Sequence, residues 1–298
     1  MKRYSAGDRV MYIFIYSFLI LLGFATFYPF WNALVISFNV GADTSMGGIT
    51  FWPRAFTIEN YEIVFKDQRI INGFMISVLR TVVGTVLAIL CTSVFAYGMS
   101  KKELMGKKYY MIMCIITMYF SGGLIPTFMV IRGLGLTNTF WVFIIPGLIS
   151  VWNMIIFRTF FRGLPAGLEE SAKIDGCGNW STFFRIVIPL SGPVIATLSL
   201  FTAIAHWNDW FGPAIYISNE NLLPIQTILK QILDSNIMSE QLANLDSASQ
   251  GRLSSMKSVT SRSLTMATMM VATLPIICVY PFVQKFFVKG VLVGSLKE

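Results

Sequence analysis

The chain has 298 residues, of which 55% are hydrophobic and only 13% charged, and its mean hydropathy is +0.65. Soluble globular domains are about 25% charged, so this composition excludes an ordinary soluble protein and predicts an all-α membrane protein. The formal net charge is +8, but the cations gather in particular loops, a pattern of membrane topology rather than of nucleic-acid binding. The four cysteines lack metal-ligand spacing, and we expect them to be packing residues.

Six apolar stretches reach the roughly 20 residues that a membrane-spanning helix needs. They lie near 11–38, 73–99, 109–131, 138–161, 188–217 and 264–288. The first is too long for the core of a signal peptide and has no convincing small-residue cleavage site, so we expect it to be retained. The predicted organisation is an N-terminal tail at 1–10, this first helix, a five-helix core over 73–288 and a C-terminal tail at 289–298.

The cations predict the orientation, because loops on the cytoplasmic side carry an excess of lysine and arginine. One side of a six-span arrangement holds most of them: Lys2, Arg3, Arg9, Lys101, Lys102, Lys107, Lys108, Arg158, Arg162, Lys173, Arg185, Lys285, Lys289 and Lys297. We therefore expect both termini in the cytoplasm. The chain is then a multi-pass protein surrounded by lipid in a bacterial cytoplasmic membrane.

The long loop at 218–263 falls on the outer side. Its start reads as a short amphipathic helix beginning at Pro224, whereas 238–257 is rich in Ser, Gln and Asn and is expected to be loosely ordered. A loop of this size is a candidate docking surface for an external binding protein. A plain interfacial helix followed by a linker explains the same residues.

The charged segment 165–187 separates the fourth and fifth stretches and is predicted to face water. Pro165 suits a first helical turn, and Glu169 and Glu170 follow where acidic side chains favour the positive end of a helix. Asp175-Gly176 predicts the end of that helix, and Asn179 is a plausible N-cap for a second one. From these residues alone, a partner-docking helix and an interfacial loop helix are equally good readings.

The order Glu170-Ser171-Ala172, Asp175-Gly176, Ile188-Pro189-Leu190 and Pro193 resembles the EAA motif of permease subunits in binding-protein-dependent ABC importers. Ser171 and Cys177 depart from the usual alanines, and both are small. The resemblance implies the type I permease fold with six transmembrane helices. It also implies that an ATPase is contacted through six residues: Glu169, Glu170, Ser171, Ala172, Asp175 and Gly176.

Four further segments resemble the carbohydrate branch of these permeases, in particular the Gram-positive subgroup that imports oligosaccharides from complex polysaccharides: 121–126, 135–139, 206–210 and 287–290. The resemblance implies a second homologous permease subunit, an extracytoplasmic solute-binding lipoprotein and a dimer of cytosolic P-loop ATPases. This chain has no GxxxxGK[ST] motif, so we expect no enzymatic activity and no cofactor in it. ATP and Mg would bind the ATPase partner.

Polar residues inside spanning segments are costly and are functional candidates by default. Five of them are predicted to line a substrate pathway for an oligosaccharide: Arg80, Asn153, Trp207, Asn208 and Asp209. Arg80 would favour a substrate with carboxylates, such as a uronate. The structural alternatives are an aromatic belt for Trp207, an ion pair of Asp209 with Arg80, and a hydrogen-bonded packing role for His206.

Two other classes of protein fit the chain less well. An ion-coupled secondary transporter could use Asp209 and His206, but no matching halves are found in the sequence and the charged central segment would have no purpose. An intramembrane enzyme would need a nucleophile elbow or a HExxH metal pair, and the chain has neither. The permease reading explains more of the chain than either.

Overall fold

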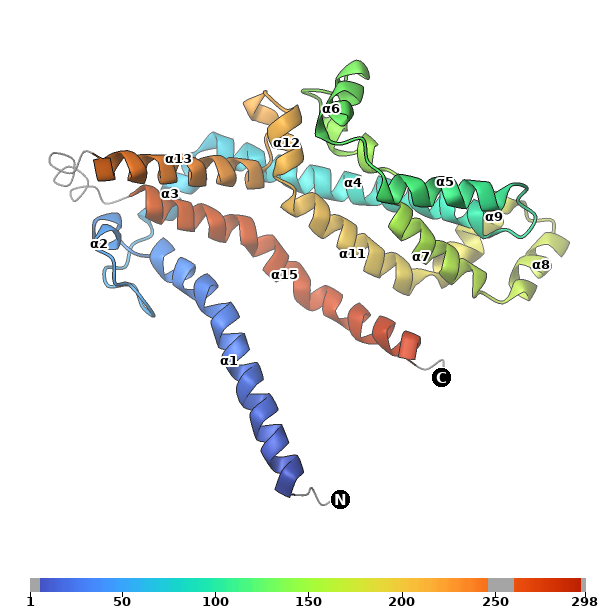
Figure 1. The fold of residues 1–298 in the computed structure, drawn as a ribbon, viewed down its shortest axis with the longest axis horizontal. Coiled ribbons are helices and arrows are strands. Elements are labelled where there is room, and N and C mark those ends of the chain that lie inside the picture. The colour runs from blue at the N-terminus through green and yellow to red at the C-terminus, as the bar shows by residue number, and fades with distance from the viewer. Residues whose placement is uncertain (1–5, 246–259, 296–298) are drawn as a thin grey trace. The chain divides into compact units, whose positions relative to one another are not determined.

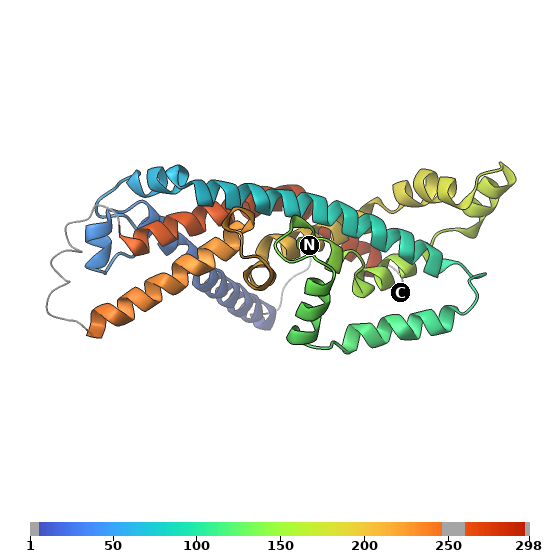
Figure 2. The same cartoon turned by 90° about the horizontal axis from the view of Figure 1, so that it is seen from above.

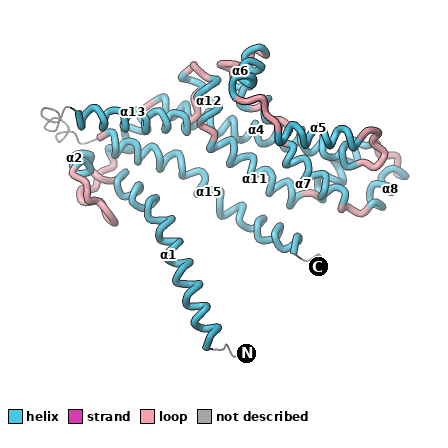
Figure 3. Tube along the Cα trace, viewed as in Figure 1, coloured by secondary structure: helices cyan, strands magenta, loops and turns pink. Residues whose placement is uncertain are grey.

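The computed structural model describes residues 6–245 and 260–295, and every regular element in those ranges is a helix (Figures 1 and 3). The longer helices are α1 (Ala6–Ser37), α4 (Gln68–Ser100), α5 (Lys107–Tyr119), α6 (Leu124–Gly133), α7 (Val151–Arg162), α11 (Gly192–Asn208), α13 (Ile225–Leu245) and α15 (Ser261–Ser295). The shorter ones are α2 (Gly41–Ser45), α3 (Glu59–Lys66), η1 (Phe140–Phe143), η2 (Ile145–Gly147), α8 (Ala166–Ile174), α9 (Asn179–Thr182), the π-helical η3 (Phe183–Val187), α10 (Ile188–Leu190), α12 (Phe211–Tyr216) and η4 (Glu220–Leu222). Within the described ranges, the only β geometry is an isolated bridge between Asn39 and Phe56. The predicted all-α fold is confirmed.

Three helices are long and apolar enough to cross a membrane unbroken: Gly7–Ser37, Gln68–Ser100 and Ser261–Val279. Three further candidate spans are pairs of helices bent at a short break, by 114° between α5 and α6, 49° between Phe140–Gly147 and α7, and 83° between Asn179–Leu190 and α11. The described chain therefore has up to six spans, as predicted. The apolar stretches at 109–131, 138–161 and 188–217 are, however, broken rather than continuous helices.

The breaks occur where the backbone cannot continue a helix. Gly123 has φ +89° just before α6, a conformation that residues with a Cβ rarely adopt. Pro146 interrupts the stretch before α7, and Pro193 stands in the first turn of α11, where its missing N–H costs no helical hydrogen bond. Hydropathy alone hides these interruptions because the flanking residues are all apolar.

The chain divides into two compact units, one made of Met1–Ile70 and Leu229–Leu274 and the other of Ile71–Ile228 and Pro275–Glu298. In the first unit, buried asparagines connect segments far apart in the sequence. Asn60 donates to the backbone carbonyls of Ser37 and Asn39 at 2.9 and 3.0 Å, and its Oδ1 accepts from the Ser263 hydroxyl at 2.9 Å. These bonds fasten α3 to the end of α1 and to the start of α15.

α1 has no buried residue within its apolar window, and large hydrophobic side chains of that part of the helix, such as Phe14 and Leu21, are exposed. An all-round apolar helix without protein cover is what a lipid-facing span requires.

The second unit is built around one apolar cluster contributed by α4, α5, α7, η3 and α11. Its most buried members include Ala96, Met154, Phe157, Phe183 and Leu198, none more than 1% exposed. Figures 1 and 2 both show α8 at one end of this unit, beside α9. The cluster therefore holds η3, which directly follows α9, against the end of α4 through Tyr97 and Phe183.

The loop after α12 contains a helix that is longer than expected. The amphipathic helix predicted to begin at Pro224 is present as α13, which begins at Ile225 and continues to Leu245. The expectation of loose order at 238–257 is therefore wrong for 238–245, which are helical, and its remainder lies outside the described residues.

Candidate functional site

The fifth span is interrupted between α11 and α12, and the interruption is stabilised by the side chain of Asp209. The backbone leaves helical geometry at this residue, with φ −69° and ψ 108°. The Oδ1 atom of Asp209 accepts a hydrogen bond from the Gly212 N–H at 3.0 Å, so the carboxylate satisfies an unpaired donor at the start of α12. The sequence prediction of one apolar stretch over 188–217 did not include this break.

Arg80 of α4 stabilises the same break from the other side. Its Nη2 donates to the backbone carbonyl of Asp209 at 2.5 Å and to that of Trp207 at 3.4 Å, and its Nη1 lies 3.8 Å from Asp209 Oδ2. The arginine side chain is 1% exposed. A cation at the C-terminal carbonyls of α11 also interacts favourably with the negative end of that helix. The ion pair between Asp209 and Arg80, one of the two alternatives from the sequence, is therefore present, with Arg80 wholly inside the protein.

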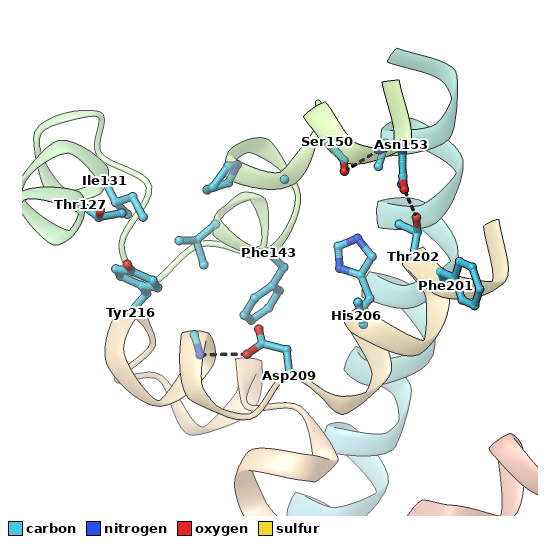
Figure 4. Close-up of a pocket in the computed structure, with 16 residues that line it drawn as sticks. Thr127, Ile131, Phe143, Ser150, Asn153, Phe201, Thr202, His206, Asp209 and Tyr216 are labelled. Atoms are coloured by element: carbon cyan, nitrogen blue, oxygen red, sulfur yellow. Dashed lines mark hydrogen bonds between the residues drawn. The ribbon is translucent and has the colours of Figure 1, made fainter. Parts of the chain in front are cut away.

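A cavity of about 510 Å³ adjoins the break (Figure 4). It lies among α4, α6, the segment 142–150, α7, α11 and α12. Its lining residues are Ala88, Thr127, Ile131, Val142, Phe143, Pro146, Gly147, Ser150, Asn153, Phe201, Thr202, Ala205, His206, Asp209, Gly212 and Tyr216. A mainly apolar wall with a few convergent polar groups is typical of ligand sites for small molecules.

The polar groups of the cavity are positioned by their neighbours. Asn153 donates from Nδ2 to the Thr202 hydroxyl at 3.2 Å, and its backbone N–H is accepted by the Ser150 hydroxyl, the N-cap of α7, at 3.3 Å. Figure 4 shows Asp209 and His206 near Phe143, with Thr202 of α11 and Asn153 of α7 close to each other and farther from Asp209. The cavity thus has two polar regions, one at the break and one where α7 meets α11.

Two of the five predicted pathway residues, Asn153 and Asp209, line this cavity. Arg80 lies behind the wall. Trp207 is 6% exposed and packs edge-to-face on Phe74 at 5.8 Å, so its ring belongs to the opposite face of α11. Asn208 is exposed but is not a lining residue.

Sequence reasoning missed other lining residues, notably Ser150 and Thr202. The spacing of residues in α11 could have identified Thr202. Thr202 precedes His206 by four residues, and residues four apart share a helix face. Ser150 gave no such signal, because its place depends on the break before α7.

The segment 165–187 forms a second candidate site. α8 runs from Ala166 to Ile174 and ends in a Schellman motif, in which the Gly176 N–H donates to Lys173 O at 3.0 Å and the Cys177 N–H to Ala172 O at 2.8 Å. Gly176 has φ +79°, which a residue with a Cβ adopts only at a cost. The predicted helix end at Asp175-Gly176 is confirmed. The N-cap prediction is wrong by one residue, because Gly178 is the cap and Asn179 the first residue of α9.

α8 is attached to the residue that follows α4 by an ion pair, and one of its own side chains is buried. Ala172 is 5% exposed, and Glu169 pairs with Lys101, which also donates to the Tyr97 hydroxyl at 2.7 Å. Burial by itself would lower the pKa of Lys101, but the hydrogen bonds to Glu169 and Tyr97 outweigh it and raise the pKa above its ordinary value. Lys101 therefore stays charged, and the attachment persists, at neutral pH.

The remaining residues predicted for partner contact, Glu170, Ser171, Asp175 and Gly176, are exposed. Ile174 is 86% exposed beside them, and Trp180 of α9 is 65% exposed. An exposed segment that presents large apolar side chains next to carboxylates has the composition of a protein-binding surface.

Comparison with known proteins agrees with this architecture. The family model described as the inner membrane component of binding-protein-dependent transport systems matches residues 2–293. The chain is 39% identical over 293 residues to the polygalacturonan/rhamnogalacturonan transport system permease protein YtcP of Bacillus subtilis (strain 168), covering 97% of this chain and 99% of that one. It is 38% identical over 276 residues to protein LplC of the same organism, covering 93% and 91%.

A solved structure has the same fold. It is a chain from the crystal structure of a bacterial ABC transporter involved in the import of the acidic polysaccharide alginate, with a TM-score of 0.87 and 28% identity. The match covers 96% of this chain and 100% of that chain. Because the family match and the shared fold both extend over nearly its whole length, this chain is a multi-pass membrane permease with the type I ABC importer fold and belongs to the family of inner membrane components of binding-protein-dependent transport systems.

Proposed function

We propose that this chain is the permease subunit of an ATP-driven importer that moves an oligosaccharide across the cytoplasmic membrane. An extracytoplasmic solute-binding lipoprotein delivers the sugar, and a second homologous permease supplies the other half of the pathway. The similarity to a polygalacturonan/rhamnogalacturonan permease and to an alginate importer favours an oligosaccharide that includes uronates. The pathway passes through the cavity lined by Asn153 and Asp209.

The observation that carries this proposal is the exposed surface of α8. Glu170, Ser171 and the glycine turn at Gly176 face solvent next to Ile174. A short helix with exposed small and apolar residues suits a groove on a partner protein. The partner is the cytosolic P-loop ATPase dimer, which binds ATP and Mg and moves α8 when its two halves close.

The attachment of α8 to α4 gives that motion a route into the membrane. Lys101 directly follows α4 and pairs with Glu169, while α4 itself carries Arg80 near the cavity. Nucleotide-driven movement of α8 therefore biases the cavity between its outward and inward states. The distribution of cations supports cytoplasmic placement of α8 and of both termini.

The test is to tag this subunit in its native membrane, solubilise it gently and identify the proteins that co-purify. We compare wild type with Gly176→Trp, which introduces a bulky side chain at the exposed end of α8. Gly135→Trp is the matched control, because Gly135 is also exposed with positive φ, +68°, and its added Cβ meets nothing within 4 Å. It lies in the turn after α6.

We expect wild type and Gly135→Trp to retain a P-loop ATPase and a second permease, and Gly176→Trp to lose the ATPase alone. Recovery of a homogeneous, solitary wild-type protein would contradict the proposal. That result would favour an ion-coupled transporter and would make Asp209 the next residue to test.

A further inference from the structure

His206 is held in the cavity wall by direct packing on the backbone of α4. A Cβ added to Gly84 would lie 2.7 Å from His206 Nε2 and 2.8 Å from Cε1, closer than real Cβ contacts occur. The ring edge that contains Nε2 therefore lies against a glycine that leaves room for it. This packing fixes the imidazole, and Nδ1 is the ring nitrogen that Gly84 does not cover.

The imidazole has unused hydrogen-bonding capacity. In the part of the chain that the structure describes, no protein group forms a hydrogen bond with His206, although the residue is half-buried. The expected packing role, with a hydrogen bond inside the protein, is therefore not what the structure shows. A half-buried polar ring that lines a cavity needs water or a ligand as its partner.

Asp209 stands three residues farther along the chain and faces the same cavity. Its side chain is 47% exposed. The carboxylate accepts one bond from Gly212 and has lone pairs on both oxygens for further donors. Together, the two side chains offer acceptors at Asp209 and a donor or acceptor at His206.

The positive charge nearby cannot reach a ligand directly. Arg80 is 1% exposed, and its guanidinium carbon lies 5.5 Å from the centre of the Phe143 ring, which itself lines the cavity. Phe143 and Asp209 therefore cover Arg80 on the cavity side. The carboxylate of Asp209, compensated by Arg80 behind it, is the charged group that faces the cavity, and its oxygens accept hydrogen bonds rather than attract the carboxylate of a uronate.

We propose that His206 and Asp209 form a sugar-binding subsite of this subunit that recognises hydroxyl groups, with Phe143 providing an apolar surface for the ring. This inference rests on the proposed function and adds to it the kind of chemical group that the subsite binds. Hydroxyl donors satisfy the carboxylate, and the imidazole completes the network. The carboxylate of an acidic sugar points away from this subsite, so selection for acidic substrates occurs elsewhere in the importer.

The experiment uses the complete importer, with both permeases, the ATPase and the binding protein, reconstituted in liposomes. Trigalacturonate is the probe, and uptake per ATP hydrolysed is measured alongside ATPase activity stimulated by the binding protein. Four variants are compared: His206→Leu, His206→Gln, Gly84→Ala and Gly98→Ala. Gly98 is the matched control, because it lies in the same helix and its added Cβ meets nothing within 4 Å.

Loss of one well-formed hydrogen bond corresponds to about a tenfold effect. We expect His206→Leu to lower uptake per ATP about tenfold with assembly and stimulated ATPase unchanged. Gly84→Ala, which displaces the ring, should act in the same direction. His206→Gln should recover part of the uptake, and Gly98→Ala should match wild type.

Wild-type uptake by both His206→Leu and Gly84→Ala would overturn the subsite while leaving the importer assignment intact. Failure of His206→Gln to exceed His206→Leu would also contradict a hydrogen-bonding role. Absence of ATP-dependent uptake by the wild-type complex is a different result, since it would refute the proposed function itself.

Discussion

Arg80 and Asp209 meet at the point where the fifth span breaks, with Nη1 of the arginine 3.8 Å from Oδ2 of the aspartate and Nη2 2.5 Å from its backbone carbonyl. The same guanidinium thus compensates a carboxylate and satisfies the end of a helix. In a membrane interior, backbone groups freed by a break need such partners. The pairing of Arg80 with Asp209 explains how the break between α11 and α12 can be stable beside the cavity.

Replacing Arg80 with Gln should therefore destabilise the protein rather than change its preference for substrate charge. The substitution weakens two buried contacts to backbone carbonyls, each worth about 1–3 kcal/mol when left unsatisfied. We expect a clearly lower thermal unfolding temperature of the purified complex and the same ratio of acidic to neutral oligosaccharide uptake in whatever complex remains. Arg69→Gln is the control, because its pair with Asp67 is 64% exposed on the arginine side and should contribute less than about 1 kcal/mol. A changed charge preference in the Arg80 variant would show that the guanidinium reaches the substrate.

Thr92 should be required to keep the wall of the cavity in place. Its hydroxyl donates to Leu148 O at 3.1 Å and accepts from the Ser150 N–H at 3.2 Å, so it holds the break before α7 against α4. Thr92→Val keeps the shape and removes both bonds, at a cost of about 1–3 kcal/mol for each group left buried and unpaired. We expect lower thermal stability and lower uptake. Thr92→Ser keeps the hydroxyl and should restore most of both, and equal loss in the two variants would assign the effect to packing.

Gly176→Ala should weaken coupling without disturbing the permease fold. The added Cβ meets nothing within 4 Å, so the effect comes from the backbone at φ +79°, where an L-residue costs about 1–2 kcal/mol. Binding-protein-stimulated ATPase activity should fall several-fold while the unfolding temperature changes little. Gly178→Ala also adds a Cβ in open space, but at φ −72°, and should behave as wild type. Equal effects at both glycines would exclude the backbone explanation.

The ion pair between Lys101 and Glu169 should make the attachment of α8 sensitive to alkaline pH. Because the folded-state pKa of Lys101 is raised, its stabilising contribution is fully present below the unfolded value of about 10.4 and is lost as pH rises through the folded value. Amide hydrogen exchange of α8 should therefore be constant from about pH 7 to 9 after correction for intrinsic rates, and should accelerate above about pH 10.4. Lys101→Met should show fast exchange of α8 throughout, whereas the exposed Lys102→Met should follow wild type. A Lys101→Met variant with unchanged exchange would show that Ala172 packing alone holds the helix.

Local features of the chain were predictable wherever neighbouring residues determine them. The end of α8 followed from Asp175-Gly176, because glycine accepts positive φ at a helix terminus. The start of α13 after Pro224 followed from the preference of proline for the beginning of a helix. The pairing of Arg80 with Asp209 was anticipated as an alternative, since two opposite charges at similar depth in a membrane have few other partners.

The breaks in three spans were not predictable in the same way. Hydropathy averages over about 20 residues and cannot distinguish a continuous apolar helix from two helices bent at a glycine or proline. The position of Ser150 in the cavity depends on one of these breaks, and the exclusion of Trp207 depends on the face of α11 that packs on Phe74. Both are properties of packing between segments far apart in the sequence.

The sequence by itself determined that this is an all-α membrane protein of the binding-protein-dependent permease family. Its composition and the motif from Glu170 to Pro193 can be recognised without knowing which distant segments pack together. The tertiary structure decided which polar residues face the cavity. Gly84 allows His206 to lie in the wall, and Phe143 with Asp209 covers Arg80. The sequence gives the chemical type of each side chain, but the exposure of that side chain depends on which residues of distant helices pack against it.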